Sequence, residues 1–279
     1  MGLRKTYRRL SNRIKRMSSD NSSINLELDR INLLPAFKVG TANVFDKPFK
    51  FHDGKNFVST YKELFIDRIY QFRPSNTDRI ILDCGANMGL SVLFFAMNYP
   101  EHQIIAGEPD ASIFKILQEN VETFGLGNVT LHERAVWDKE ETLTFFTDRG
   151  MGGRVENAYT GQQPQLVKTV RLSDFLTPGV DFLKIDIEGA EGVVLADCKD
   201  KLSVVNNIFF EDHNDIRKTQ ILHELLALVK DQGFHYYIKE SFTRDKPFTD
   251  SQLVCEVFDM AINVFCYKVQ RNGKDLVNK

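Results

Sequence analysis

From residue 79 onward, the sequence alternates between short apolar segments with the length of buried strands and amphipathic segments with the length of helices. This alternation predicts parallel strands joined by helices that cover both faces of one sheet. In such a fold, ligands bind beyond the carboxyl ends of the strands. The sequence therefore predicts an α/β protein whose functional residues lie in the loops that follow the strands.

The expected elements are bounded by polar and glycine-containing segments. Asp110 is expected to cap the second helix of this region, and Gly125 to end it. Segments 142–146 and 167–172 alternate like a pair of strands and enclose a polar loop. The expected strands are 79–83, 103–107, 129–136, 181–187, 204–210, 235–238 and 261–268, and the expected helices are 90–98, 110–124, a segment from about 190, and 220–232.

The first 17 residues differ in charge from the rest of the chain. They hold seven basic residues and no acidic one, with apolar residues spaced four and three positions apart. The rest of the chain carries 29 basic and 38 acidic residues, a net charge of −9, whereas the whole chain has −2. The spacing predicts a basic amphipathic helix over residues 1–19. Three interpretations stay open: a helix on an anionic membrane surface, a helix packed on a partner subunit, and a frayed tail.

The other predicted units follow in order along the chain. An N-terminal extension of mixed α+β character is expected at 20–78, with a polar linker at 18–23 and a helix at 59–72. The main domain is predicted to span 79–270, and a tail to follow at 271–279.

Composition excludes several classes of protein. The longest apolar runs are far shorter than the roughly 20 residues of a membrane-spanning helix, and a net charge of −2 argues against a nucleic-acid partner. Cys84, Cys198, Cys255 and Cys266 form no C-x-x-C pair and are expected to be buried free thiols, as in a reducing compartment. We expect a cytoplasmic protein, or one held at the inner face of a membrane through residues 1–17. The oligomeric state stays open.

The first strand of the alternating region leads into D-C-G-A-N-M-G, residues 83–89. Gly85 and Gly89 allow a sharp turn and a close approach to a ligand. Backbone amides at the start of the next helix can hold an anionic or carboxylate-bearing group. The loop lacks both the G-x-G-x-x-G fingerprint and the lysine of a P-loop, so a tight turn without a ligand is the alternative.

An acidic residue, Glu108, ends the second strand, 25 positions after Asp83. A carboxylate at this place accepts hydrogen bonds from both hydroxyls of a ribose. The alternative is a solvent-exposed acid that caps the following helix. Together with the glycine loop, Glu108 predicts a cofactor that contains adenosine.

Four motifs, D-C-G-A-N-M-G, G-E-P-D, R-A-V-W and K-I-D-I-E-G-A-E, resemble the FkbM family of S-adenosylmethionine-dependent methyltransferases over roughly residues 79–240. The resemblance implies a class I methyltransferase (Rossmann-like) fold with seven strands, the seventh antiparallel. It implies methylation of a hydroxyl on a sugar, glycan precursor or secondary metabolite. The cofactor contacts that it implies are Asp83, Gly85, Ala86, Asn87 and Gly89 at the methionine end, Glu108 at the ribose, and Glu133, Ala135 and Val136 at the adenine.

Acidic residues and a histidine follow the fourth and fifth strands. Asp186, Glu211 and His213 are expected to meet, because the carboxyl ends of neighbouring strands share one edge of the sheet. His213 is the expected general base for the hydroxyl proton, and Asp186 is the second candidate. The same three residues are candidate ligands of magnesium or manganese, with metal dependence left open. Glu191 is expected only to favour the positive end of a helix dipole.

The sequence says least about which residues bind the acceptor. Arg154 and Tyr159, in the loop between the paired strands, are candidates to bind a sugar or phosphate, and Glu188 is a third candidate. A solvated loop without this role is the alternative for Arg154 and Tyr159. The competing functions are an NAD-dependent oxidoreductase, which the missing glycine pattern disfavours, and a non-catalytic module that binds a membrane or partner.

Overall fold

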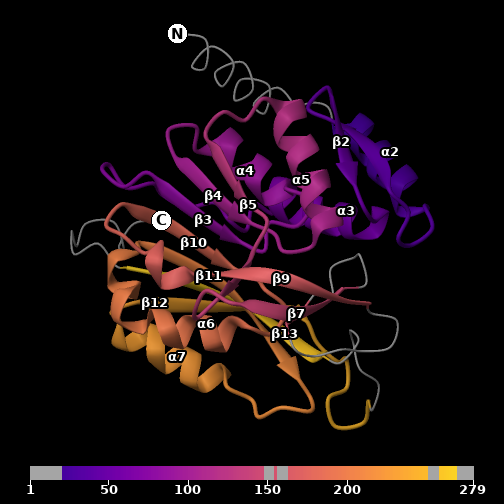
Figure 1. The fold of residues 1–279 in the computed structure, drawn as a ribbon. Helices are drawn as coiled ribbons and strands as arrows, with labels where there is room; N and C mark the ends of the chain where they lie inside the picture. Colours follow the sequence, from indigo (N-terminus) through magenta and orange to yellow (C-terminus); the bar gives the residue numbers. More distant parts are fainter. Residues whose placement is uncertain (1–20, 148–153, 156–162, 251–257, 269–279) are drawn as a thin grey trace, which may run out of the picture.

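The centre of the molecule is a seven-stranded sheet in the order β12-β13-β11-β10-β3-β4-β5 (Figure 1). The computed structural model describes residues 21–147, 154–155, 163–250 and 258–268. All strand pairs are parallel except those of β13, which runs antiparallel to β11 and β12. The predicted mostly parallel sheet with one reversed strand is thus confirmed. The strands are β3 Ile80–Cys84, β4 Gln103–Gly107, β5 Val129–His132, β10 Val180–Ile185, β11 Asn207–Asp215, β12 His235–Phe242 and β13 Phe258–Tyr267.

Helices cover both faces of this sheet, and each face has its own apolar core. Helices α4 (Leu90–Asn98) and α5 (Ala111–Phe124) pack on one face, and α6 (Glu191–Cys198) and α7 (Leu222–Asp231) pack on the other (Figure 1). The predicted boundaries of α5 are correct. Asp110 accepts hydrogen bonds from the backbone amides of Ser112 and Ile113, and the helix ends at a glycine with a φ of 65°.

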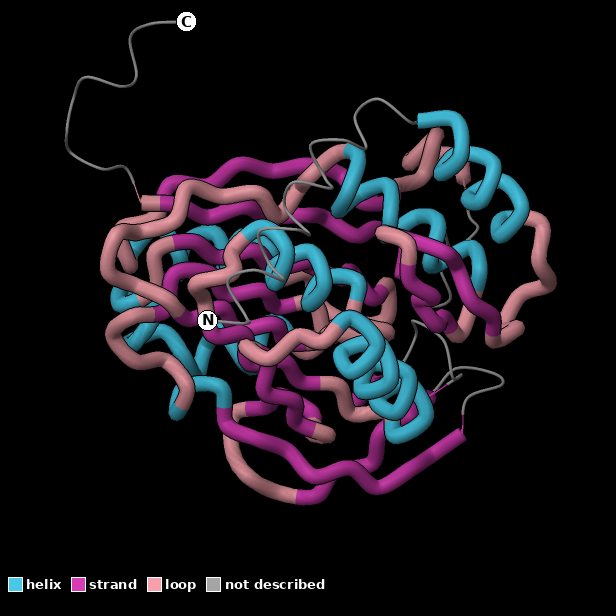
Figure 2. The backbone as a smooth tube through the Cα atoms, turned by 90° about the horizontal axis from the view of Figure 1, so that it is seen from above, coloured by secondary structure: helices cyan, strands magenta, loops and turns pink. Residues whose placement is uncertain are grey.

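The N-terminal extension contains a helix, a hairpin and a second helix, and it lies at the right-hand side of the molecule in Figures 1 and 2. Its buried phenylalanines join the core that contains α4 and α5. Asn120 of α5 binds the backbone of Lys50 through both its amide nitrogen and its amide oxygen. The elements are α2 Asn21–Asn32, β1 Gly40–Val44, β2 Lys47–Phe51, α3 Gly54–Tyr61 and a π-helical turn at Lys62–Ile66.

Two predictions for this extension are wrong. Residues 21–23, expected in a linker, already belong to α2. The helix expected at 59–72 begins earlier, because Asp53 caps it by accepting a hydrogen bond from Asn56, and its π-helical continuation ends at Ile66. The predicted helix at 1–19 lies outside the described residues.

A second sheet lies beyond the carboxyl end of β5, in the order β6-β9-β7-β8. The predicted pairing of 142–146 with 167–172 is confirmed, since Leu143 of β7 lies opposite Val167 of β9. The single strand expected at 129–136 is wrong, because β5 pairs in the large sheet and β6 in the small one. The strands are β6 Ala135–Trp137, β7 Thr142–Thr147, β8 Arg154–Val155 and β9 Gln163–Arg171.

The structure also bears on the cysteines and on membrane-spanning helices. Cys84, Cys198 and Cys266 are buried free thiols, as predicted, and Cys255 lies outside the described residues. Among the described residues, no helix has both the length and the apolar character needed to cross a membrane.

Candidate active site

A cavity of about 510 Å³ lies at the carboxyl ends of β3, β4, β10 and β11. Its lining comes from the loops after these strands, from the N-terminal extension, and from β12 and β13. Of the predicted site residues, the lining includes Gly85, Ala86, Asn87, Glu108, Ala135, Val136, Asp186, Glu188, Glu211 and His213.

The glycine loop after β3 has an unusual backbone. Gly85, Asn87 and Gly89 all have a positive φ, at 84°, 48° and 94°. A Cβ atom on Gly85 would lie 1.9 Å from the carbonyl oxygen of Asp186, so no other residue fits there without a backbone shift. Asn87 holds the turn through its Oδ1 atom, which accepts from the amide of Met88 and lies 2.7 Å from Nε2 of His52.

Glu108 lies inside the cavity wall, with only 6% of its surface exposed. Its two carboxylate oxygens accept hydrogen bonds from the amides of Asn87 (3.0 Å) and Asp110 (2.9 Å). Burial raises the pKa of Glu108 to about 8, although these two hydrogen bonds act to lower it. The alternative of an exposed capping acid is wrong, because Asp110 caps α5.

Three predicted cofactor residues lie outside the cavity lining, namely Asp83, Gly89 and Glu133. Asp83 is fully buried on β3, where it accepts a hydrogen bond from the hydroxyl of Ser91. Through this hydrogen bond, Asp83 links β3 to the first turn of α4, on either side of the glycine loop. The assignment of these three as cofactor contacts stays a prediction.

Lys184 connects the loops after β3 and β10. It stands in a strand whose residues are all buried. Its Nζ atom lies 2.8 Å from the carbonyl oxygen of Gly85, 3.4 Å from Oδ1 of Asp83 and 3.2 Å from Oδ2 of Asp186. Burial lowers the pKa of Lys184, but the carboxylates of Asp186 and Asp83 more than offset this and raise it above its ordinary value. The charged lysine therefore holds the two strand ends together.

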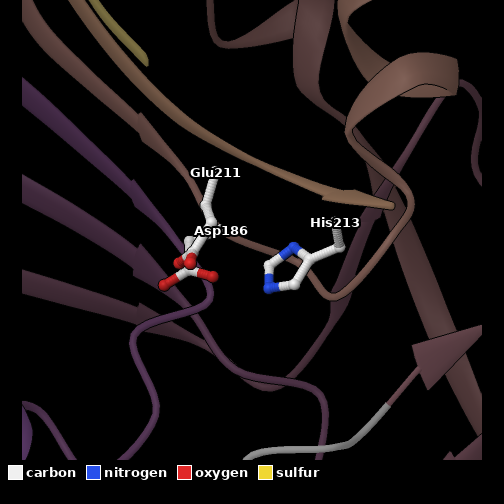
Figure 3. Close-up of side chains that lie close together, drawn as sticks. All are labelled: Asp186, Glu211 and His213. Atoms are coloured by element: carbon white, nitrogen blue, oxygen red, sulfur yellow. The ribbon is translucent and has the colours of Figure 1, made fainter. Parts of the chain in front are cut away.

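Asp186, Glu211 and His213 meet at the end of β10 and along β11 (Figure 3). One potential ligand atom from each lies within 4.8 Å of those of the other two. Burial raises the pKa of Glu211, and the nearby charge of Asp186 adds to this effect. The sequence correctly predicted that these side chains converge, and their catalytic role stays a prediction.

The histidine of this cluster is surrounded by carboxylates. Nδ1 of His213 lies 3.1 Å from Oε1 of Glu191, and Nε2 lies 3.6 Å from Oε2 of Glu188. Burial lowers the pKa of His213, but the charges of Glu188 and Glu191 raise it well above its ordinary value. These carboxylates therefore favour the protonated form of the imidazole.

The prediction for Glu191 is wrong. This carboxylate is only 2% exposed, and its Oε1 atom accepts a hydrogen bond from the amide of Ile187 as well as contacting His213. A buried carboxylate in this position orients the imidazole ring instead of acting only on the helix dipole. Glu188 has a positive φ of 57° and lines the cavity.

Sequence reasoning missed the cavity residues that come from distant segments. Glu63, in the π-helical turn of the extension, is the main example. Burial raises the pKa of Glu63 to about 7, and the charges of Glu211 and Asp186 add to this effect. No motif surrounds Glu63, so only the docking of the extension reveals it. Asn263 of β13 was missed for the same reason, and it lies opposite Glu211 in the strand register.

The predicted acceptor residues of the polar loop are not placed by the structure. Arg154 belongs to β8, where it pairs with Phe146, but its side chain is not described. Tyr159 lies outside the described residues. Both stay predictions.

The sheet order with one reversed strand, the glycine loop after β3 and the acidic residue after β4 define a class I methyltransferase. The sequence model described as "Methyltransferase FkbM domain" matches residues 83–236, more than half of the chain. The chain belongs to the FkbM methyltransferase family, and it is an S-adenosylmethionine-dependent enzyme. Membership of this family excludes the two competing functions, the NAD-dependent oxidoreductase and the non-catalytic module.

Several curated proteins are similar to this chain. "Methyltransferase 1" of Beauveria bassiana is 29% identical over 178 residues, 54% of this chain and 71% of that protein. "2-O-methyltransferase NoeI" of Sinorhizobium fredii is 28% identical over 48% of this chain and 63% of that protein. "31-O-demethyl-FK506 methyltransferase FkbM" of Streptomyces tacrolimicus is 25% identical over 62% of this chain and 80% of that protein.

Proposed function

We propose that this enzyme transfers a methyl group to a hydroxyl of a small polyhydroxylated acceptor, such as a sugar, a glycan precursor or a secondary metabolite. One observation carries the proposal: a single cavity joins the glycine loop and Glu108 to the cluster of Asp186, Glu211 and His213. The names of two relatives, a 2-O-methyltransferase and a 31-O-demethyl-FK506 methyltransferase, support the same chemistry.

The residues at the loop end of the cavity fit the cofactor. Gly85 has no Cβ and so lets the loop pack against the carbonyl of Asp186 after β10, and the buried oxygens of Glu108 suit a ribose diol. Ala135 and Val136 offer an apolar surface for the adenine. Bound there, S-adenosylmethionine supplies a methyl group on a positively charged sulfur. Carboxylates of the cavity stabilise that charge.

The protein must then align the acceptor and receive its proton. The acceptor oxygen forms a bond to the methyl carbon, the carbon–sulfur bond breaks, and S-adenosylhomocysteine leaves. His213 lines the cavity beside Asp186 and Glu211 and is one candidate for this role. The carboxylates of Asp186, Glu211 and Glu63 line the same cavity and are the other candidates.

Transfer of a labelled methyl group tests the proposal. The full chain is incubated with labelled S-adenosylmethionine and a panel of sugars, lipid-linked glycan precursors and polyketides. Label in an ether, stable to mild alkali, supports the proposal. Label recovered as an alkali-labile ester, or on nitrogen, contradicts it. Glu108→Gln serves as a control with weakened cofactor binding.

A further inference from the structure

The cluster of Asp186, Glu211 and His213 is a compact set of donor atoms, within 4.8 Å of one another (Figure 3). Figure 3 shows the two carboxylates side by side and the imidazole ring turned toward them. We propose that these three residues hold a divalent cation of the magnesium or manganese class next to the acceptor hydroxyl. This inference rests on the proposed O-methyl transfer and deepens it.

The orientation of His213 is the first independent argument. Its ring is 4% exposed, and Glu191 Oε1 is placed to accept the proton of Nδ1. Nε2 then faces the cavity, and its 3.6 Å distance to Glu188 is too long for a hydrogen bond. A buried carboxylate behind an imidazole is the usual arrangement that orients a metal-binding histidine. Nε2 is therefore the ring nitrogen that would bind the cation.

Asn263 provides the second argument. It lies opposite Glu211 across the antiparallel pair of β11 and β13, and it lines the cavity. Among the described residues, its buried Oδ1 atom has no hydrogen-bond partner. An unsatisfied buried oxygen is costly, and a cation or a water bound to it would satisfy this oxygen.

The charge balance of the cavity agrees with these contacts. Besides Asp186 and Glu211, the carboxyl groups of Glu63, Glu108, Asp110 and Glu188 line it, and its lining also holds Lys184, beside Asp186, and Arg134. The carboxyl groups outnumber Lys184, Arg134 and the positive sulfur of the cofactor taken together. Two carboxylates, one imidazole and an amide oxygen suit manganese or magnesium better than zinc, which favours nitrogen and sulfur ligands.

The cation would acidify the acceptor. A hydroxyl bound to a divalent metal loses its proton more readily, as metal-bound water does. The proton passes to Glu63, which lines the same cavity and is not among the proposed ligands. The oxygen then bonds to the methyl carbon while the carbon–sulfur bond breaks. One proton and one methyl group are thereby transferred, and no oxidant or reductant is needed.

Binding of Mn²⁺ to the full chain tests the site without any acceptor. Free Mn²⁺ is followed by electron paramagnetic resonance during titration of wild type, Asp186→Asn, Glu211→Gln and Asp212→Asn. We expect one Mn²⁺ site in wild type. Its affinity for Mn²⁺ should be at least tenfold weaker in Asp186→Asn and Glu211→Gln. Asp212→Asn, one residue along β11 from Glu211, should bind like wild type. Wild type without a Mn²⁺ site, or Glu211→Gln with unchanged affinity, would overturn the inference.

Two further measurements separate this inference from the proposed function. Binding of S-adenosylhomocysteine should survive in Glu211→Gln, which shows that the variant is folded. If chelator-treated enzyme methylates hydroxyls at the wild-type rate, the cation inference fails and the O-methyltransferase stands. If Mn²⁺ binds but label appears only in esters or amines, the O-methyltransferase proposal fails and the metal site stands.

Discussion

The two ends of the cavity are built in different ways. The end that we propose binds the cofactor, called the cofactor end, depends on backbone shape, with Gly85 and Asn87 in left-handed conformations and the amide of Asn87 bound to Glu108. The end that we propose binds the acceptor, called the acceptor end, depends on charged side chains that come from distant segments, such as Glu63 of the extension and Glu211 of β11. A short continuous motif can encode the first end, whereas only the assembled fold produces the second.

This difference predicts different effects of substitution. A change at the cofactor end should weaken cofactor binding and therefore lower the rate of every reaction that the enzyme performs. A change at the acceptor end should leave the cofactor bound and lower the rate of transfer. Calorimetry with S-adenosylhomocysteine and the rate of methyl transfer separate the two outcomes.

The largest effect is expected for Gly85→Val. The new side chain would meet the Asp186 carbonyl in a backbone conformation that L-residues avoid, so the loop must move. We expect S-adenosylhomocysteine affinity to fall by more than about 100-fold, which corresponds to about 2.7 kcal/mol. Gly125→Ala is the matched control, since Gly125 also has a positive φ but no atom within 4 Å of its Cβ position. It should cost about 1 kcal/mol of stability and leave binding unchanged.

Glu211→Gln should show the opposite pattern. We expect the rate of methyl transfer to fall by about 100-fold, the lower range for loss of an acid–base or metal-binding group. Cofactor affinity should stay within about threefold, because β10 separates Glu211 of β11 from the glycine loop after β3 and from Glu108 after β4. A variant that loses cofactor binding and transfer together would show that the two ends are not separable.

Glu108→Gln should weaken S-adenosylhomocysteine binding by about tenfold or more, since the new NH2 group cannot accept a hydrogen bond from the ribose or from the amides of Asn87 and Asp110. It should also change the pH dependence of stability. The folded protein keeps a proton on Glu108 up to its pKa of about 8, whereas the unfolded chain releases it near 4.5. The free energy of unfolding therefore falls as pH rises from about 4.5 to 8. In Glu108→Gln, denaturant titrations across this range should show a smaller decrease.

Sequence patterns predicted the central sheet because its strands and helices depend on local apolar spacing. They also predicted the meeting of Asp186, Glu211 and His213, since neighbouring strand ends share an edge. They could not predict the break between β5 and β6, because β6 pairs with β9, whose residues lie some thirty positions further along. No sequence pattern around Glu63 or Asn263 marks either residue as part of the cavity. Their place in the cavity depends on how the extension and the reversed strand dock.

The smallest effect is expected for His52→Gln, and it tests how independent the cofactor end is. His52 follows β2 of the extension, and its Nε2 atom lies 2.7 Å from Oδ1 of Asn87 in the glycine loop. Loss of one hydrogen bond of about 1 kcal/mol should weaken S-adenosylhomocysteine binding roughly fivefold. The apparent KM for the cofactor should rise by a similar factor while kcat is preserved. If binding is unchanged, the glycine loop keeps its shape without this contact from the extension. The residues of the loop motif are then sufficient to form the cofactor end.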